Sequence, residues 1–276
     1  MSSKRKRIAT TEVPQSEEQK DVKKRVRWCT NRCFSGKLHR MFKGLSDLLT
    51  QEQSNLLMQT KLGHFVNIPD ISISMMYIEQ ILQRWNKEKR GLQLGDEFVS
   101  PTISEVAVML GIPGVGKKVV WMTDDKIVSK SFDEICNGNI TQFDSEKLKE
   151  RLIELAGKPG RDNAIKFVQL YLALVFGLFL FPSTNARPPS GMFKYIDDPS
   201  TICTYNWAAA VHFHLLRGLD HASDEIRKGK QGDIYVQGCT AFLMVSLCLF
   251  YILANMIVFE CCSVIIMKTC NVELFI

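Results

Sequence analysis

The feature that most limits how this chain can fold is a long apolar run from Phe167 to Phe181, closed by Pro182. Gln169 is the one residue in the run with a strongly polar side chain. A helix that crosses a bilayer needs ~20 apolar residues, so this run is short for a membrane span. Proline cannot continue a helix and ends it here. We therefore predict a fully buried core helix, with the main core built between residues 163 and 239.

Helix-start signals are placed at two points before this run. Thr50 is followed three residues later by Gln53, and Thr102 by Glu105, which is the pattern of a capping box. Gly111 then follows the second helix and is expected to end it. Both patterns predict short helices that expose polar caps and bury one apolar face.

Other segments complete the expected architecture. Asp70 is expected to cap a helix that carries apolar residues up to Trp85, and a packing helix is expected over 206–219. The pair Gly95-Asp96 interrupts a short alternating stretch, which predicts a small hairpin. The expected fold class is mainly α, an irregular multi-helix domain with a small β-hairpin and a disordered basic N-terminal arm.

Positive charge is concentrated at the N-terminus. Residues 1–44 carry thirteen Lys or Arg and four acids, so the other 232 residues hold 22 basic and 25 acidic groups. Two clusters in this arm are typical of nuclear-import signals, and a solubilising tail or weak nucleic-acid contact are the alternatives. The import candidates are Lys4, Arg5, Lys6, Arg7, Lys23, Lys24, Arg25 and Arg27.

Nine scattered cysteines indicate reduced thiols in the cytosol or nucleus. Cys29, Cys33 and His39 invite a zinc interpretation, but a closed zinc site needs four ligands and no second pair lies near them in sequence. We predict neither a metal site nor a cofactor.

The segment Gly111–Lys118 resembles a phosphate-binding loop except at its last position, where Lys118 replaces the required hydroxyl. A true phosphate loop follows a strand and opens a helix, whereas this one is expected to follow a helix. We interpret it as a helix-terminating turn. An enzyme that uses Lys117 on a phosphate is retained as the weakest hypothesis.

The histidines and acidic residues of the C-terminal half do not form a catalytic pattern. His212 and His214 are two residues apart, so on a helix they point to different sides and cannot chelate together. Asp220, His221 and Asp224 are expected to lie in a turn after Gly218. No catalytic residue is predicted, and the chain is expected not to be an enzyme.

Four blocks of sequence resemble the plant mobile domain, a family also described as aminotransferase-like. They are FVSPTISEVAVMLGIPG (98–114), YLALVFGLFLFP (171–182), YNWAAAVHFHLLRGL (205–219) and YVQGCTAFLMV (235–245). The resemblance covers about residues 92–245. It implies a helical, transposon-derived domain, with nuclear members linked to meristem maintenance and to silencing of mobile elements. The family has no established catalytic residues that could be transferred to this chain.

The resemblance divides the chain into a basic arm (1–40), a helical domain (41–245) that is expected to lack some family helices, and an apolar tail (246–276). Residues 241–259 carry no charge and are long enough to span a bilayer. Three interpretations stay open for the tail: a translated intron or truncated gene, a true tail anchor, and a core helix.

The expected function is a non-enzymatic nuclear module that binds proteins, with an import receptor and chromatin-associated proteins as expected partners. The alternative is a tail-anchored membrane protein with a cytosolic helical domain.

Overall fold

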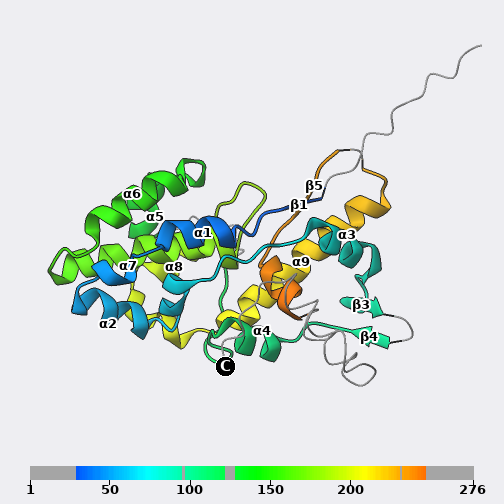
Figure 1. The fold of residues 1–276 in the computed structure, drawn as a ribbon, viewed down its shortest axis with the longest axis horizontal. Coiled ribbons are helices and arrows are strands. Elements are labelled where there is room, and N and C mark those ends of the chain that lie inside the picture. The colour runs from blue at the N-terminus through cyan, green and yellow to red at the C-terminus, as the bar shows by residue number, and fades with distance from the viewer. Residues whose placement is uncertain (1–28, 95–96, 122–127, 231, 247–276) are drawn as a thin grey trace, which may run out of the picture.

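The structure is a computed structural model, and it describes residues 29–94, 97–121, 128–230 and 232–246. It is mainly helical with two small sheets, which confirms the predicted fold class (Figure 1). The described part begins earlier than the expected arm ends, since residues 29–31 already form a strand and a helix starts at Ser35. The predicted boundary at residue 40 therefore cuts through this helix.

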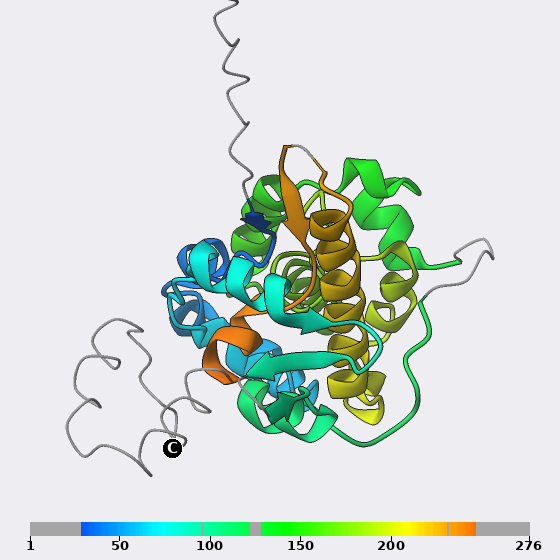
Figure 2. The same ribbon diagram turned by 90° about the vertical axis from the view of Figure 1, so that its right-hand side faces the viewer.

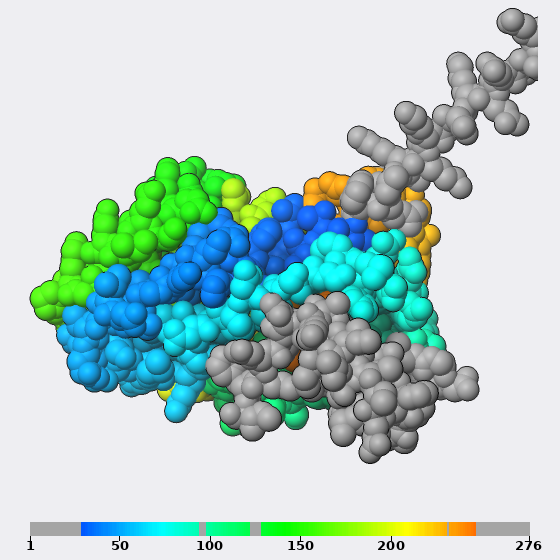
Figure 3. All heavy atoms as spheres, in the orientation of Figure 1, coloured from blue at the N-terminus to red at the C-terminus, as the bar shows by residue number. Residues whose placement is uncertain are grey.

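The elements of the first half lie along one face of the molecule. Figure 3 shows the blue to cyan segment as a continuous band across that face. These elements are β1 (Cys29–Asn31), α1 (Ser35–Phe42), α2 (Gln51–Gln59), α3 (Met75–Arg84), β2 (Trp85–Asn86), β3 (Gly91–Leu94), β4 (Glu97–Val99) and α4 (Ile103–Leu110).

The second half supplies the two long helices. Its elements are α5 (Lys130–Cys136), α6 (Ser145–Leu155), α7 (Arg161–Val175), α8 (Phe193–Ile196), α9 (Trp207–Arg227) and β5 (Ile234–Val236). Residues 240–246 are also helical. Short 3-10 turns are η1 (Ser46–Leu48), η2 (Gly63–Asn67), η3 (Ile140–Gln142), η5 (Ser190–Met192) and η6 (Pro199–Thr204), and η4 (Phe176–Leu180) is a π-helical segment.

Helix α7 is the predicted core helix, continued by η4 up to Pro182. Every residue from Leu170 to Val175 is buried. The polar groups inside the run are paired, because the Tyr171 hydroxyl donates to the carbonyl of Leu62 at 2.8 Å and the Gln169 amide donates to the carbonyl of Asp197 at 3.1 Å. By length and composition α7 with η4 is the one described helix that could cross a membrane, but 78% of its apolar window is buried inside the protein. The prediction of a core helix is confirmed.

Helix α9 organises the other half of the molecule. Figure 2 shows it running beside β5, and α3 and α4 also pack against it. Gly218 lies where α9 meets the chain after β5, because a Cβ there would come within 2.3 Å of the Gln237 carbonyl oxygen. The helix was expected to end at Leu219, but it continues to Arg227.

The two sheets fix distant segments. Strand β1 pairs in parallel with β5, so that Asn31 lies opposite Val236. The predicted hairpin is confirmed as β3 and β4, and β2 adds a third antiparallel strand in the order β2-β3-β4. The strand β2 contains Trp85, which was expected to lie in the preceding helix.

Local helix starts follow the predicted capping rules in part. Both capping boxes are present, Thr50 with Gln53 and Thr102 with Glu105. The predicted cap at Asp70 is wrong, since α3 begins at Met75 after Ser74 and has no side-chain cap. The polar residues over 70–74 therefore lie in the loop that precedes α3.

Candidate protein-binding groove

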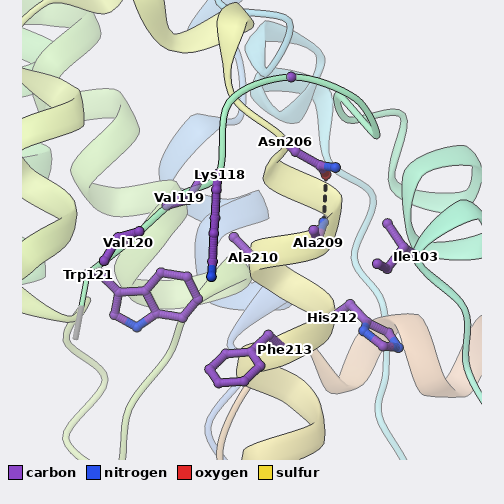
Figure 4. A pocket seen from close by; sticks show the side chains of 11 residues that line it. Ile103, Lys118, Val119, Val120, Trp121, Asn206, Ala209, Ala210, His212 and Phe213 are labelled. Atoms are coloured by element: carbon purple, nitrogen blue, oxygen red, sulfur yellow. Dashed lines mark hydrogen bonds between the residues drawn. The ribbon is translucent and has the colours of Figure 1, made fainter.

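An apolar groove of about 560 Å³ lies between α9, the start of α4 and the extended segment 116–121 (Figure 4). The extended segment forms one wall, and the first two turns of α9 form the floor. The side chains that matter most below are Ile103, Lys118, Val120, Trp121, His212 and Phe213. The groove is lined mainly by carbon, which suits a ligand that buries apolar surface.

Backbone hydrogen bonds hold the wall in place. Lys117 N–H donates to the carbonyl of Thr204 at 2.8 Å, and Asn206 N–H donates to the carbonyl of Lys117 at 2.9 Å. Gly116 has a φ of 133°, and a Cβ there would lie 2.4 Å from the Thr204 carbonyl oxygen. Glycine is therefore required for this close approach, because other residues rarely adopt that backbone conformation.

The Tyr195 hydroxyl fixes the next residue of the wall. It accepts from the Val120 N–H at 2.7 Å and donates to the Val120 carbonyl at 2.9 Å. Burial raises the pKa of Tyr195, so the hydroxyl keeps its proton near neutral pH and can serve both bonds. The wall is consequently positioned before any ligand binds.

The floor is positioned by the start of α9. The Asn206 side chain accepts from the Ala209 N–H at 2.8 Å and caps the helix. Trp207 is buried and donates its indole N–H to the carbonyl of Ile202 at 2.7 Å. The small side chains of Ala209 and Ala210 leave space above the helix. The alanines of the expected packing helix thus also shape the groove.

Three apolar side chains at the groove remain open to solvent. Ile103 is 40% exposed, Val120 is 41% exposed and Phe213 is 39% exposed. Trp121 is largely buried and meets Phe213 edge to face, with ring centroids 5.9 Å apart. An aromatic pair of this kind, half in the core and half at the surface, is typical of binding anchors.

The groove carries one ammonium group and no carboxylate among its described lining residues. Figure 4 shows the Lys118 side chain extending along the groove toward Ala210. Within the described residues its amine has no ion-pair or hydrogen-bond partner. The Nε2 of His212 lies 2.8 Å from the carbonyl oxygen of Pro101, so this ring nitrogen is used within the fold. The local charge therefore favours an acidic group on the ligand.

The segment that resembles a phosphate loop forms part of this wall. Gly111 ends α4 in the left-handed conformation, which confirms the predicted helix-terminating turn. The Lys117 amine lies 5.9 Å from the centroid of the Tyr205 ring. Lys117 thus stacks on a neighbouring ring, and the extended backbone that follows opens no helix.

His212 and His214 of α9 point to different environments, as predicted. His212 faces the groove, whereas His214 is buried with its Nε2 3.3 Å from the carbonyl oxygen of Pro182. Burial lowers the pKa of His214 to about 4. It is therefore a neutral core residue near neutral pH.

The expected turn around Asp220, His221 and Asp224 is wrong, because all three lie within α9. The Asp220 carboxylate accepts from the indole N–H of Trp85 at 2.8 Å. The Lys87 amine lies 2.6 Å from the Asp224 carboxylate, and this hydrogen bond lowers the pKa of Asp224. These acids tie the three-stranded sheet to α9.

The residues considered for zinc have other contacts. Cys33 is buried with its sulfur 3.6 Å from the carbonyl oxygen of Phe179, and His39 Nδ1 lies 2.8 Å from the carbonyl oxygen of Ile68. No group of three or more His, Cys, Asp or Glu is placed to hold a metal ion in the part of the chain that the structure describes.

Two predicted features lie mostly outside the described residues. All eight import candidates fall within residues 1–28, and most of the uncharged stretch falls within residues 247–276. Its first residues are described and belong to the core, since Ala241, Phe242, Leu243 and Met244 are buried.

Sequence reasoning missed the groove. Val119, Val120 and Trp121 were identified only as the segment that follows the glycine-rich turn, and Phe213 only as part of a helix. The available signal was weak: one aromatic residue, Phe213, at helical spacing from Asn206, Ala209 and Ala210, which are polar or small.

Comparison with known proteins relates this chain to plant proteins. Three proteins of Arabidopsis thaliana are similar: Protein MAIN-LIKE 1 is 27% identical over 210 residues, Protein MAIN-LIKE 2 is 23% identical over 184, and Protein MAINTENANCE OF MERISTEMS is 22% identical over 203. The matches cover 70%, 63% and 71% of this chain and 40%, 27% and 41% of the relatives. The matched part of the chain thus spans less than half of each relative. No solved structure matches.

A family profile described as "Domain of unknown function (DUF8566)" matches residues 31–244. The match begins in β1 and ends within the last described helix (240–246), so it covers the groove and both long helices. The chain therefore belongs to this family, and it is itself distantly related to the MAIN-LIKE proteins.

Proposed function

We propose that this chain is a non-enzymatic, nuclear protein-interaction module of the plant mobile domain type, derived from a mobile element. The observation that carries the proposal is the groove, a preformed apolar surface beside three solvent-open side chains. Exposed apolar surface of this kind is commonly a binding site for another protein. The relation to a protein named for maintenance of meristems supports a role in that process. Silencing of mobile elements is the other role that the resemblance to the plant mobile domain implies.

The groove supports binding better than catalysis. Two of its polar lining groups each have one atom used within the fold, since the Asn206 side-chain oxygen caps α9 and His212 Nε2 lies beside the Pro101 carbonyl. General acid–base chemistry needs a group within hydrogen-bond reach of a substrate proton and with a suitable pKa. Lys118 is an exposed amine without a base beside it among the described residues.

The basic arm supports the nuclear location. Its two clusters are separated by about fifteen residues, and an extended arm can present them to the acidic pockets of an import receptor. Chromatin-associated proteins are the proposed partners of the folded body. The near-neutral charge of the rest of the chain disfavours strong binding of nucleic acid by the fold itself.

A tail-anchored membrane protein is the second candidate, based on the uncharged stretch 241–259. The fold takes up the first four residues of the stretch, because 241–244 are buried. Residues 245–259 then remain, fifteen residues where a span needs ~20. This count favours the nuclear module over the anchor.

Imaging of a fluorescent fusion at the N-terminus tests the location. In plant cells the intact chain should accumulate in the nucleus, and replacing both basic clusters with glutamine should release it to the cytosol. Replacing three exposed lysines of the body, Lys43, Lys158 and Lys194, is the matched control and should leave import unchanged. A rim of fluorescence at the endoplasmic reticulum would contradict the proposal and support the anchor.

A further inference from the structure

We propose that the groove binds a short segment of another protein in which apolar residues flank an Asp or Glu, and that this carboxylate pairs with Lys118. The inference deepens the proposed function and rests on it. It specifies the chemistry of the partner and leaves its identity open.

The apolar part of the proposal follows from the shape and lining of the groove. Ile103, Val120 and Phe213 stand around a floor of alanines, and Trp121 closes one end beside Phe213. Apolar side chains of a partner would cover the exposed parts of these residues and exclude water. Aromatic residues at the centre of such a contact usually contribute most of its affinity.

The acidic part follows from Lys118. A partner that filled the groove with apolar side chains alone would cover this ammonium group without pairing it. Removing a charge from water without a partner is costly, whereas a carboxylate placed beside the amine offsets that cost. The ion pair also makes binding selective, because a basic or uncharged segment could not form it with Lys118.

Charge distinguishes this partner from the basic arm and from the stretch 241–259 of the chain itself, whereas the end of the chain, which carries Glu260 and Glu273 among apolar residues, is tested by deletion below. The N-terminal arm is strongly basic and would place like charges beside Lys118. The stretch 241–259 has no charge and would leave the amine unpaired. A second copy docked groove to groove in a two-fold dimer would bring one Lys118 toward the other.

A small molecule fits the groove less well than a peptide. The volume of about 560 Å³ is sufficient, but small-molecule sites usually present several convergent polar groups. Here Asn206 and His212 each use one polar atom within the fold, and Lys118 supplies the one charged group among the described lining residues. One charge within an apolar lining suits a segment that carries its own backbone hydrogen bonds, such as a helical turn.

Selection from a library tests the proposal on the full chain. Random peptides of about twelve residues are displayed and selected for binding to the immobilised protein. We expect the enriched peptides to share an Asp or Glu flanked by apolar residues. Each enriched peptide is then synthesised with a fluorescent label, together with a neutral variant in which Asp is replaced by Asn or Glu by Gln. Both peptides are titrated with the protein, and binding is measured by fluorescence anisotropy.

A double-mutant cycle locates the charge pair. Lys118→Met keeps the length of the side chain, removes its charge and should weaken the acidic peptide about fivefold. Neutralising the peptide should cause a similar loss with the intact chain and almost none with Lys118→Met. Phe213→Ala should weaken both peptides about tenfold.

Matched controls lie in α6 and just after it, outside the groove. Lys158→Met removes an exposed lysine, and Ile153→Ala truncates a side chain that is 46% exposed, close to the exposure of Phe213. Both should bind the peptide as the intact chain does. Urea unfolding of each variant shows that the fold is retained.

Three results would overturn the proposal. The enriched peptides could lack acids, or the losses from Lys118→Met and from the neutral peptide could simply add. Thirdly, peptides could bind only after residues 247–276 are deleted, which would mean that the chain's own end occupies the groove. A failure of nuclear import with peptide binding intact would instead count against the proposed location alone.

Discussion

Helices α7 and α9 are both long and amphiphilic in part, but they are buried in different ways. From Leu170 onward α7 and η4 are surrounded on all sides, and the polar groups of Gln169 and Tyr171 have partners inside the protein. Helix α9 is buried on one face and leaves residues such as Phe213 and His221 exposed on another. The comparison shows that one helix determines the core, whereas the other also provides a surface.

The largest expected effect is on the free energy of unfolding, which should fall much more when a ring is removed from α7 than from α9. Phe167→Ala removes a ring from α7 that has no solvent exposure and should cost about 3–5 kcal/mol. Phe213→Ala removes a ring from α9 that is 39% exposed and should cost about 1 kcal/mol or less. Urea denaturation of both variants measures this. Equal losses would show that the surface face of α9 is in fact part of the core.

The buried face of α9 should make stability depend on pH. Burial lowers the pKa of His214 to about 4, from an ordinary value of 6.5. Between these pH values the unfolded chain binds a proton that the folded chain does not, so stability is complete above pH 6.5 and falls as the pH is lowered toward 4. The difference of 2.5 corresponds to about 3 kcal/mol. Denaturation at a series of pH values should show a shallower slope for His214→Gln, and an unchanged slope would contradict the assignment.

A smaller loss of stability is expected from a substitution at Gly218, where α9 packs against the chain that follows β5. Gly218→Ala would place a Cβ 2.3 Å from the Gln237 carbonyl oxygen and should destabilise the fold by about 1–3 kcal/mol. Gly36→Ala in α1 is the matched control, since its new Cβ would meet only the movable side chains of Asp70 and Arg40. Thermal unfolding of the pair measures the difference. A neutral Gly218→Ala would mean that α9 and this segment are not in close contact.

The smallest expected effect is on the helix that contributes Ile103 to the groove. Thr102→Ala removes the side chain that accepts from the Glu105 N–H at 3.1 Å, and it should cost about 1 kcal/mol. Thr50→Ala removes the equivalent bond from α2, on the α7 side of the molecule. We expect similar losses of stability in urea, but weaker peptide binding only for Thr102→Ala. If both variants bound the peptide equally well, the start of α4 would not contribute to peptide binding.

Local patterns predicted much of the fold, because they depend on neighbouring residues. The apolar run before Pro182 predicted α7, and the spacing of Thr and Gln or Glu predicted both capping boxes. The extension of α9 through Asp220 was missed, because the acids resemble a turn until Trp85 and Lys87 supply their partners from the sheet. The pairing of β1 with β5 joins residues about two hundred positions apart and has no local signal.

The groove could not be predicted for a related reason. Its wall depends on Gly116 approaching Thr204 and on Tyr195 holding Val120, which are contacts between segments far apart in sequence. In the sequence, Lys118 is notable only because it replaces the hydroxyl that a phosphate-binding loop requires. The fold places it beside α9. Sequence alone thus predicted the helix-terminating turn at Gly111, and tertiary structure was needed to place Lys118 in the groove.

The most direct test of the account is one titration of a selected acidic peptide against the intact chain and Phe213→Ala, with unfolding measured on the same samples. We predict an affinity lower by about tenfold and an unfolding free energy changed by about 1 kcal/mol or less. Unchanged affinity, or a loss of stability as large as that of Phe167→Ala, would contradict the claim that α9 presents a binding surface.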